Sequence, residues 1–264
     1  SIPIPDFVYD IVKTAWEREG IMALVRKSYL AGNLKVGFEI SGDAAVIHAE
    51  GAAAVSEENL ILGTVTIVPQ SIKKWISISD EAYDLRGEAF LRYIYDELTY
   101  QIAKKAADAL VSLIVSAPAT SGPTTVGVST VDVAALSVGT IAEAMGKLAD
   151  SAANPVIIMN KGTWSAFKAV QYANGFSVDP FEGLPVVFNN SLKTFTAAGD
   201  GDTFAIVGDL EQGALANFPN GDGIAFKYDD QTLMTEDLVR ILGRQYVALG
   251  IVAPGAFVKL NKDI

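Results

Sequence analysis

Few side chains in this sequence could carry acid–base or nucleophilic chemistry. His48 is the single histidine and there is no cysteine, so a site of the Ser-His-Asp or Cys-His type has one possible base and no thiol nucleophile. A metal site built from several histidines or from cysteines is excluded for the same reason. His48 lies in a segment rich in alanine and glycine, and we expect no catalytic role for it.

Two of the adjacent carboxylate pairs could be mistaken for acid–base partners. These are Glu57-Glu58 and Asp229-Asp230. Neighbouring side chains of a strand point to opposite faces, so neither pair would converge on a substrate. Both are typical of solvated acidic turns.

Two glycine–aspartate segments, residues 199–202 and 220–223, resemble the start of a calcium loop. Neither continues with the later glutamate of an EF-hand, so both indicate turns. The sequence contains no GxGxxG and no GxxxxGK[ST] phosphate-binding motif. We therefore predict that the protein is not an enzyme and holds no metal or cofactor.

The composition indicates where the function lies instead. Half of the 264 residues are hydrophobic, and excess apolar surface is usually buried in oligomer interfaces. With 31 acidic against 20 basic residues the net charge is −11, which disfavours binding to nucleic acid or anionic membranes. No uninterrupted apolar run of about 18 residues predicts a transmembrane helix.

The longest element that could position anything is a predicted helix from Gly87 to Ser116. Its apolar residues recur every three or four positions, which places them on one stripe of a helix. The stripe consists of Leu91, Ile94, Leu98, Ile102, Ala106, Ala109 and Leu113. At 1.5 Å per residue the helix is roughly 45 Å long, more than a compact domain needs.

The chain before this helix indicates an arm, a hairpin and a strand. Pro3 and Pro5 favour an extended N-terminal arm, followed by a short helix over residues 7–19. Residues 33–68 begin and end with strand-like segments around a long acidic, alanine-rich stretch, which predicts a projecting hairpin. In residues 71–86 we expect alternation, with Ile72, Trp75, Ile76 and Ile78 on the apolar side.

Beyond the helix the pattern changes to short alternating strands and helices. Residues 117–130 are rich in Pro, Gly, Ser and Thr and predict a hinge. We then expect helices over 132–148 and 161–172, and buried strands over 154–160, 183–189 and 203–209. Three final strands, over 223–230, 237–252 and 255–261, are expected to return to the long helix.

The order of these segments resembles the major capsid proteins of tailed bacteriophages, which have the Hong Kong 97-like fold. The resemblance covers nearly the whole chain and is carried by five stretches. They are the hairpin at 33–68, VPQSIKKWISISDEAYD at 68–84 before the long helix, NPVIIMNKGTWSAFKAV at 154–170, FEGLPVVFNNSL at 181–192 with AIVGDLEQG at 205–213, and the closing block at 237–260.

This resemblance implies an α+β subunit with four parts. They are an N-terminal arm (1–30), an extended loop (31–68), a peripheral domain with a spine helix at 87–116 (69–124 and 221–264), and an axial domain (125–220). It also implies self-assembly into pentamers and hexamers of an icosahedral head around double-stranded DNA. The subunit would be part of the virion, assembled in the bacterial cytoplasm, with portal, scaffold or decoration proteins as partners. Many relatives lose an N-terminal segment during maturation, which is compatible with a chain that begins at Ser1.

Residue-level expectations follow from the same resemblance. Some relatives join their subunits covalently through a lysine near the tip of the extended loop, but residues 41–59 contain no lysine. Lys35 lies at the base of the loop, so we predict no covalent cross-link. We expect the charged side of the long helix to meet the acidic loop tip of a neighbouring subunit. The expected contacts are Arg92, Asp96, Lys104 and Asp108 on the helix and Glu50, Glu57 and Glu58 on the loop.

Two alternatives remain open at this point. The first is an encapsulin-like bacterial compartment, which has the same fold but encloses a protein cargo in place of a genome. The second is a soluble α/β enzyme or ligand-binding protein, which would be a small particle with one concave polar pocket. The sequence leaves the triangulation number, the host and any decoration proteins open.

Overall fold

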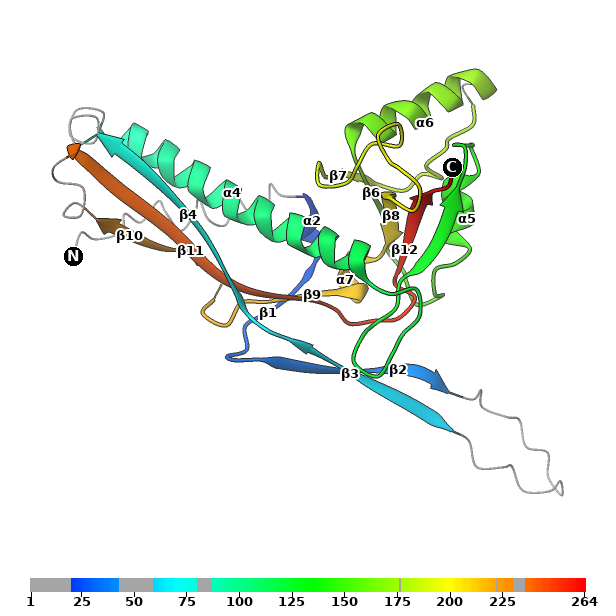
Figure 1. The fold of residues 1–264 in the computed structure, drawn as a ribbon, viewed down its shortest axis with the longest axis horizontal. Coiled ribbons are helices and arrows are strands. Elements are labelled where there is room, and N and C mark those ends of the chain that lie inside the picture. Colours follow the sequence, from blue (N-terminus) through cyan, green and yellow to red (C-terminus); the bar gives the residue numbers. More distant parts are fainter. Residues whose placement is uncertain (1–19, 43–58, 80–86, 176, 222, 230–235) are drawn as a thin grey trace.

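A computed structural model describes residues 20–42, 59–79, 87–175, 177–221, 223–229 and 236–264. It has three parts, shown in Figure 1: a long helix packed on one sheet, a second sheet with its own helices, and a hairpin that projects from the body. The expected N-terminal helix (7–19) and most of the hairpin tip lie outside the described residues.

The first sheet is organised around one long strand, β11 (Leu238–Ile251), with which most of its other strands pair. Residues 238–247 of β11 pair antiparallel with β4 (Gln70–Ser79), and residues 240–244 also pair antiparallel with β10 (Ala225–Asp229). The last four residues of β11, 248–251, pair with β9 (Ala214–Asn217), which in turn pairs parallel with β1 (Arg26–Ser28). Burial along β11 alternates, as expected for a sheet with one covered face.

The long helix, α4, has the predicted bounds Gly87–Ser116 and lies along β4 and β11 (Figure 1). The predicted stripe is confirmed from Ile94 to Ala106, since Ile94, Leu98, Ile102 and Ala106 are all buried. Towards the end the buried positions become Leu110 and Ile114, while Leu113 is 37% exposed. At about 100° per residue, Ile114 is roughly 160° around the helix from Leu98. The buried face therefore rotates along α4.

The rotation has a physical cause in the second sheet. Its strand order is β5 (Ser129–Val133), β12 (Phe257–Lys262), β8 (Thr203–Gly208), β6 (Val156–Met159) and β7 (Val186–Phe188). Ile158 and Ile206 belong to the core cluster that contains the buried face of α4. Ile157 and Val207 belong to a separate cluster on the other face. The end of α4 thus packs toward a different sheet from its beginning.

Short helices complete this second unit. They are α5 (Thr140–Met145), α6 (Lys161–Asn174) and α7 (Leu210–Gly213), with α2 (Gly20–Leu24) near α4 and α7. Asn160 caps α6 by accepting a hydrogen bond from Gly162 N at 2.9 Å. Asp209 caps α7 in the same way, through Glu211 N and Gln212 N.

Several expectations for this half of the chain are wrong. Residues 132–148 are not one helix, because the β-branched alternation of residues 129–133 forms β5 beside β12. β7 is an edge strand and only partly buried. β12 does not join the first sheet; it pairs with β5 and β8 in the second. β9, which falls within residues 125–220, pairs with β11 in the first sheet.

The predicted hairpin consists of β2 (Leu34–Gly42) and β3 (Leu60–Ile67), paired antiparallel with an irregularity between Glu39 and Ser41. Its base is anchored on β11, where a Cβ at Gly250 would overlap the buried side chain of Ile67. The predicted hinge at 117–130 is hydrogen-bonded to β3 of this hairpin, since Thr64 N donates to Pro123 O at 2.9 Å.

Candidate assembly surfaces

Several of the candidates for chemistry fall on residues that the structure does not describe. His48, Glu57, Glu58 and Asp230 lie outside the described residues. Asp202 uses Oδ2 to accept hydrogen bonds from Lys193 Nζ at 2.5 Å and from Gly199 N at 2.8 Å, which lowers the pKa of its carboxyl. In the part of the chain that the structure describes, no three His, Asp or Glu side chains are grouped so that they could hold a metal ion. None of the described helices is both long and apolar enough to span a bilayer.

The distal end of the hairpin exposes a run of apolar side chains. Leu60, Ile61 and Leu62 are 61%, 53% and 64% exposed, although they are consecutive in a strand. Nearer the body the ribbon is better covered, because Phe38 is buried over Gly63 of the opposite strand. A two-stranded ribbon with both faces exposed is marginal in water. The distal hairpin therefore presents surface suited to burial against another molecule.

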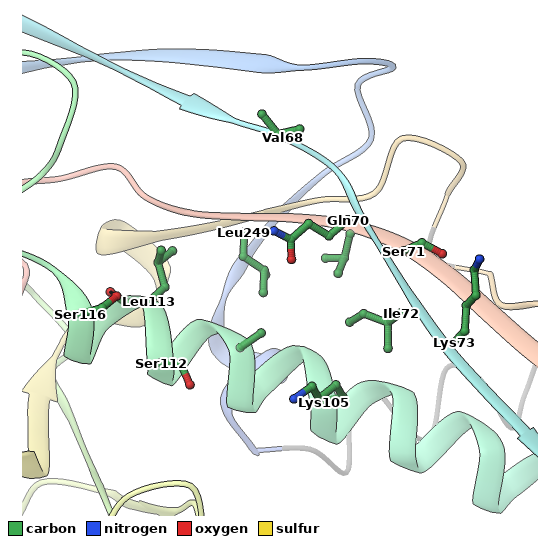
Figure 2. A pocket seen from close by; sticks show the side chains of 12 residues that line it. Val68, Gln70, Ser71, Ile72, Lys73, Lys105, Ser112, Leu113, Ser116 and Leu249 are labelled. Atoms are coloured by element: carbon green, nitrogen blue, oxygen red, sulfur yellow. Dashed lines mark hydrogen bonds between the residues drawn. The ribbon is translucent and has the colours of Figure 1, made fainter.

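A groove of about 650 Å³ lies between β4 and α4 (Figure 2). Its apolar lining includes Ile72, Leu113 and Leu249, and Lys73 and Lys105 also line it. Ala109, which lies three turns after Leu98 on the same side of α4, is among the lining residues as well. The groove opens where the buried face of α4 turns toward the second sheet, which leaves the original apolar stripe uncovered.

The charged residues predicted as contacts are spread around α4. Arg92 is exposed, and Asp96 lies one turn after it on the same side, half-buried. Lys104 is half-buried and lies roughly 120° around the helix from Arg92. Asp108 is not free to meet a neighbour, because its Oδ1 accepts a hydrogen bond from Asn189 Nδ2 at 2.9 Å. The loop residue Glu50, like Glu57 and Glu58, lies outside the described residues.

A buried lysine completes the junction between α4 and the second sheet. Lys259 of β12 is 7% exposed, and its Nζ donates to Val115 O at 3.1 Å and to Ala117 O at 2.7 Å. These carbonyls lie at the C-terminus of α4, where the helix leaves acceptors unpaired and its dipole favours a positive charge. Burial lowers the pKa of Lys259. The sequence gives no local signal for this contact, since the partners are more than 140 residues apart.

The outer face of the first sheet also differs from expectation. Trp75 is 65% exposed, because side chains alternate between the two faces of a strand. Ile72 and Ile76 are an even number of residues apart and share one face of β4, whereas Trp75 lies on the other. The guanidinium of Arg240 lies 4.9 Å from the centre of its ring. The two-residue period of a strand is enough to predict from the sequence that Trp75 lies on the opposite face from Ile72 and Ile76.

Comparison with known proteins is consistent with this architecture. The model of the phage capsid family matches residues 4–262. The capsid of a native GTA particle computed with C5 symmetry has a TM-score of 0.74 at 15% identity, covering 95% of this chain and 91% of that one. A chain of Gordonia phage Cozz has a TM-score of 0.63 at 16% identity, with 93% and 87% covered. A virus-like particle from Pyrococcus furiosus has a TM-score of 0.65 at 11% identity, with 96% of each chain covered. No curated protein sequence matches the chain.

Proposed function

Since the chain belongs to the phage capsid family, we propose that its copies form pentamers and hexamers of an icosahedral shell around double-stranded DNA. The protein is a structural capsid subunit of the virion and not an enzyme, so the soluble-enzyme alternative is wrong. One observation carries the finer proposal: the hairpin projects from the body with three consecutive large apolar residues uncovered, Leu60 to Leu62. Exposing these apolar side chains to water is unfavourable in an isolated subunit, and assembly would bury them against a neighbouring subunit.

Within the shell we assign the parts of the chain as follows. Residues 1–30 are an N-terminal arm and 31–68 an extended loop, both lying over neighbouring subunits. Residues 69–124 and 221–264 form the peripheral domain around α4, and 125–220 the axial domain at the five-fold and six-fold axes. The exchange of β12 and β9 between the sheets ties these two domains together, which supports a subunit that moves as one piece.

The same proposal names contacts between subunits. The acidic loop tip, with Glu50, Glu57 and Glu58, meets the exposed start of α4 on a neighbour, where Arg92 supplies the positive charge. Asp96 and Lys104 border that contact. Portal, scaffold or decoration proteins would be further partners, and assembly would take place in the cytoplasm of the host.

The encapsulin-like alternative is less well supported. The likeness to the virus-like particle from Pyrococcus furiosus is at 11% identity and shows a shared fold only. The family match to phage capsids extends over nearly the whole chain.

Electron microscopy of the purified protein tests the proposal directly. We expect closed shells tens of nanometres wide, against a particle of 28.0 kDa for an isolated subunit. Shells from infected cells should contain double-stranded DNA. A monodisperse monomer would refute the assembly proposal, and a single protein cargo in place of DNA would favour the compartment.

A further inference from the structure

Two asparagines in the sequence are followed directly by glycine. They are Asn174, before Gly175 at the end of α6, and Asn220, before Gly221 in the turn after β9. Asparagine is thermolabile, because the backbone nitrogen of the next residue can attack its side-chain amide. Glycine favours this attack, since it has no Cβ to obstruct the approach and its backbone rotates freely. Both pairs are therefore chemically competent in an unfolded chain.

The fold protects the second pair. Gly221 N donates a hydrogen bond to Phe218 O at 3.0 Å, and this bond must break before the nitrogen can attack. Gly221 O accepts a hydrogen bond from Gln245 Nε2 at 2.9 Å. Phe218 and Gln245 are both buried. Gly221 is thus tied through its nitrogen and its oxygen to the interior of the subunit.

The first pair lacks this protection. Asn174 and Gly175 are both exposed. Among the described residues none accepts a hydrogen bond from Gly175 N, although the nitrogens that directly follow α5 and α7 each bond back to their own helix. Gly175 O accepts a long hydrogen bond, from Val178 N at 3.4 Å. Gly175 has a φ of 105°, a conformation that glycine adopts without a side-chain clash.

One contact opposes the reaction at Asn174. Its Nδ2 donates to Val170 O at 2.9 Å, one turn back along α6, and this holds the side-chain amide against the helix. The bond is exposed and involves the last residue of α6, where helices fray. Water can replace an exposed partner at little cost, whereas releasing Gly221 leaves the amide of the buried Gln245 without its acceptor.

We propose that Asn174 is a site of spontaneous deamidation in the folded protein and that Asn220 is not. Gly175 N attacks Cγ of Asn174 and forms a cyclic succinimide. The side-chain nitrogen leaves as ammonia and takes the proton that Gly175 N gives up. Water then opens the ring at either carbonyl, which yields aspartate or isoaspartate. The net reaction consumes one water and releases one ammonia, and nothing is oxidised or reduced.

Each event places one negative charge at the C-terminal end of α6. The helix dipole favours a cation there, so the new carboxylate lies at the unfavourable end of the helix. α6 contains Lys161 and Lys168 but no acidic residue, and the reaction therefore introduces its first carboxylate. The chemistry needs only water, and it proceeds whether or not the subunit is part of a shell.

Peptide mass spectrometry of aged protein tests the proposal. Native protein and protein unfolded in urea are incubated side by side at mildly alkaline pH, and the aspartate and isoaspartate formed at each site are followed with time. The unfolded chain should react at similar rates at both sites. Folding should slow Asn220 about ten-fold or more, because the hydrogen bonds of Gly221 must first break, and should slow Asn174 by no more than about three-fold.

Two variants sharpen the measurement. Asn174→Gln should abolish product at position 174 and leave Asn220 unchanged, because the longer side chain would have to close a larger ring. Gln245→Met keeps the length of the side chain but removes the hydrogen bond to Gly221 O, and it should accelerate the reaction at Asn220.

Three results would overturn the proposal. They are equal slowing of both sites on folding, faster reaction at Asn220 than at Asn174 in the native protein, and no product at Asn174 over a period in which the unfolded chain reacts completely. The first two are read from the unmodified protein, so they do not depend on whether a variant folds. None of these results bears on shell formation, which electron microscopy tests separately.

Discussion

Replacement of Lys259 by methionine should destabilise the subunit by about 2 kcal/mol. The change keeps the length and burial of the side chain but removes two hydrogen bonds from a charged group, to Val115 O and Ala117 O. Bonds of this kind contribute about 1.5–3 kcal/mol each, and part of that is returned because methionine has no charge to desolvate. For a domain of this size the melting temperature should fall by about 4 to 8 °C.

The pH dependence of this effect has a defined sign. Burial lowers the pKa of Lys259 from its ordinary value of 10.5, so the folded protein loses this proton at lower pH than the unfolded chain. Between the two pKa values the unfolded state binds more protons, and the contribution of Lys259 to the free energy of unfolding rises with pH. The gap between native protein and variant should therefore widen as pH approaches 10.5 and stay constant well below the folded pKa.

Denaturant titration of unassembled subunits, followed by tryptophan fluorescence, measures both quantities. Lys147→Met is the matched control, because Lys147 is exposed and its Nζ donates to a single carbonyl, Thr130 O, at 2.7 Å. That control should change stability by less than about 0.5 kcal/mol. Equal losses in the two variants, or a gap that narrows as pH rises, would refute the assigned role of Lys259.

Three further predictions address the hairpin and the shell. Gly250→Val should destabilise the subunit by about 1–3 kcal/mol in the same titration, because a side chain there overlaps Ile67; unchanged stability would mean that the hairpin base is not held there. Arg92→Glu should reduce shell formation seen by electron microscopy while leaving the circular dichroism spectrum unchanged; normal shells would exclude the contact with the acidic loop tip. Intact particles should run as one 28.0 kDa band on a denaturing gel, because residues 41–59 contain no lysine, and a ladder would contradict this.

Local periodicity was sufficient to predict the elements with long or pure patterns. α4 was bounded to the residue because a helical pattern continues over thirty positions until Pro118 stops it. The hairpin, β6, α6 and β8 were also found, since each has a uniform pattern over most of its length. β5 was missed because Val131 and Val133 fit both a strand and the start of a helical stripe over a few residues.

What the sequence could not predict depends on contacts far apart in the chain. Nothing in residues 257–262 indicates that β12 pairs with β5 and β8, since these partners come from earlier segments. The same applies to Asp108, which the helical pattern assigns to the charged side of α4, whereas in the structure its carboxylate accepts a hydrogen bond from Asn189. The groove was equally invisible, because its lining comes from β4, α4 and β11.

One cause connects the junction and the groove. α4 follows the first sheet over its first half and is fastened to the second sheet by Asn189 and Lys259 over its last turns. The groove lies where the helix passes from one sheet to the other.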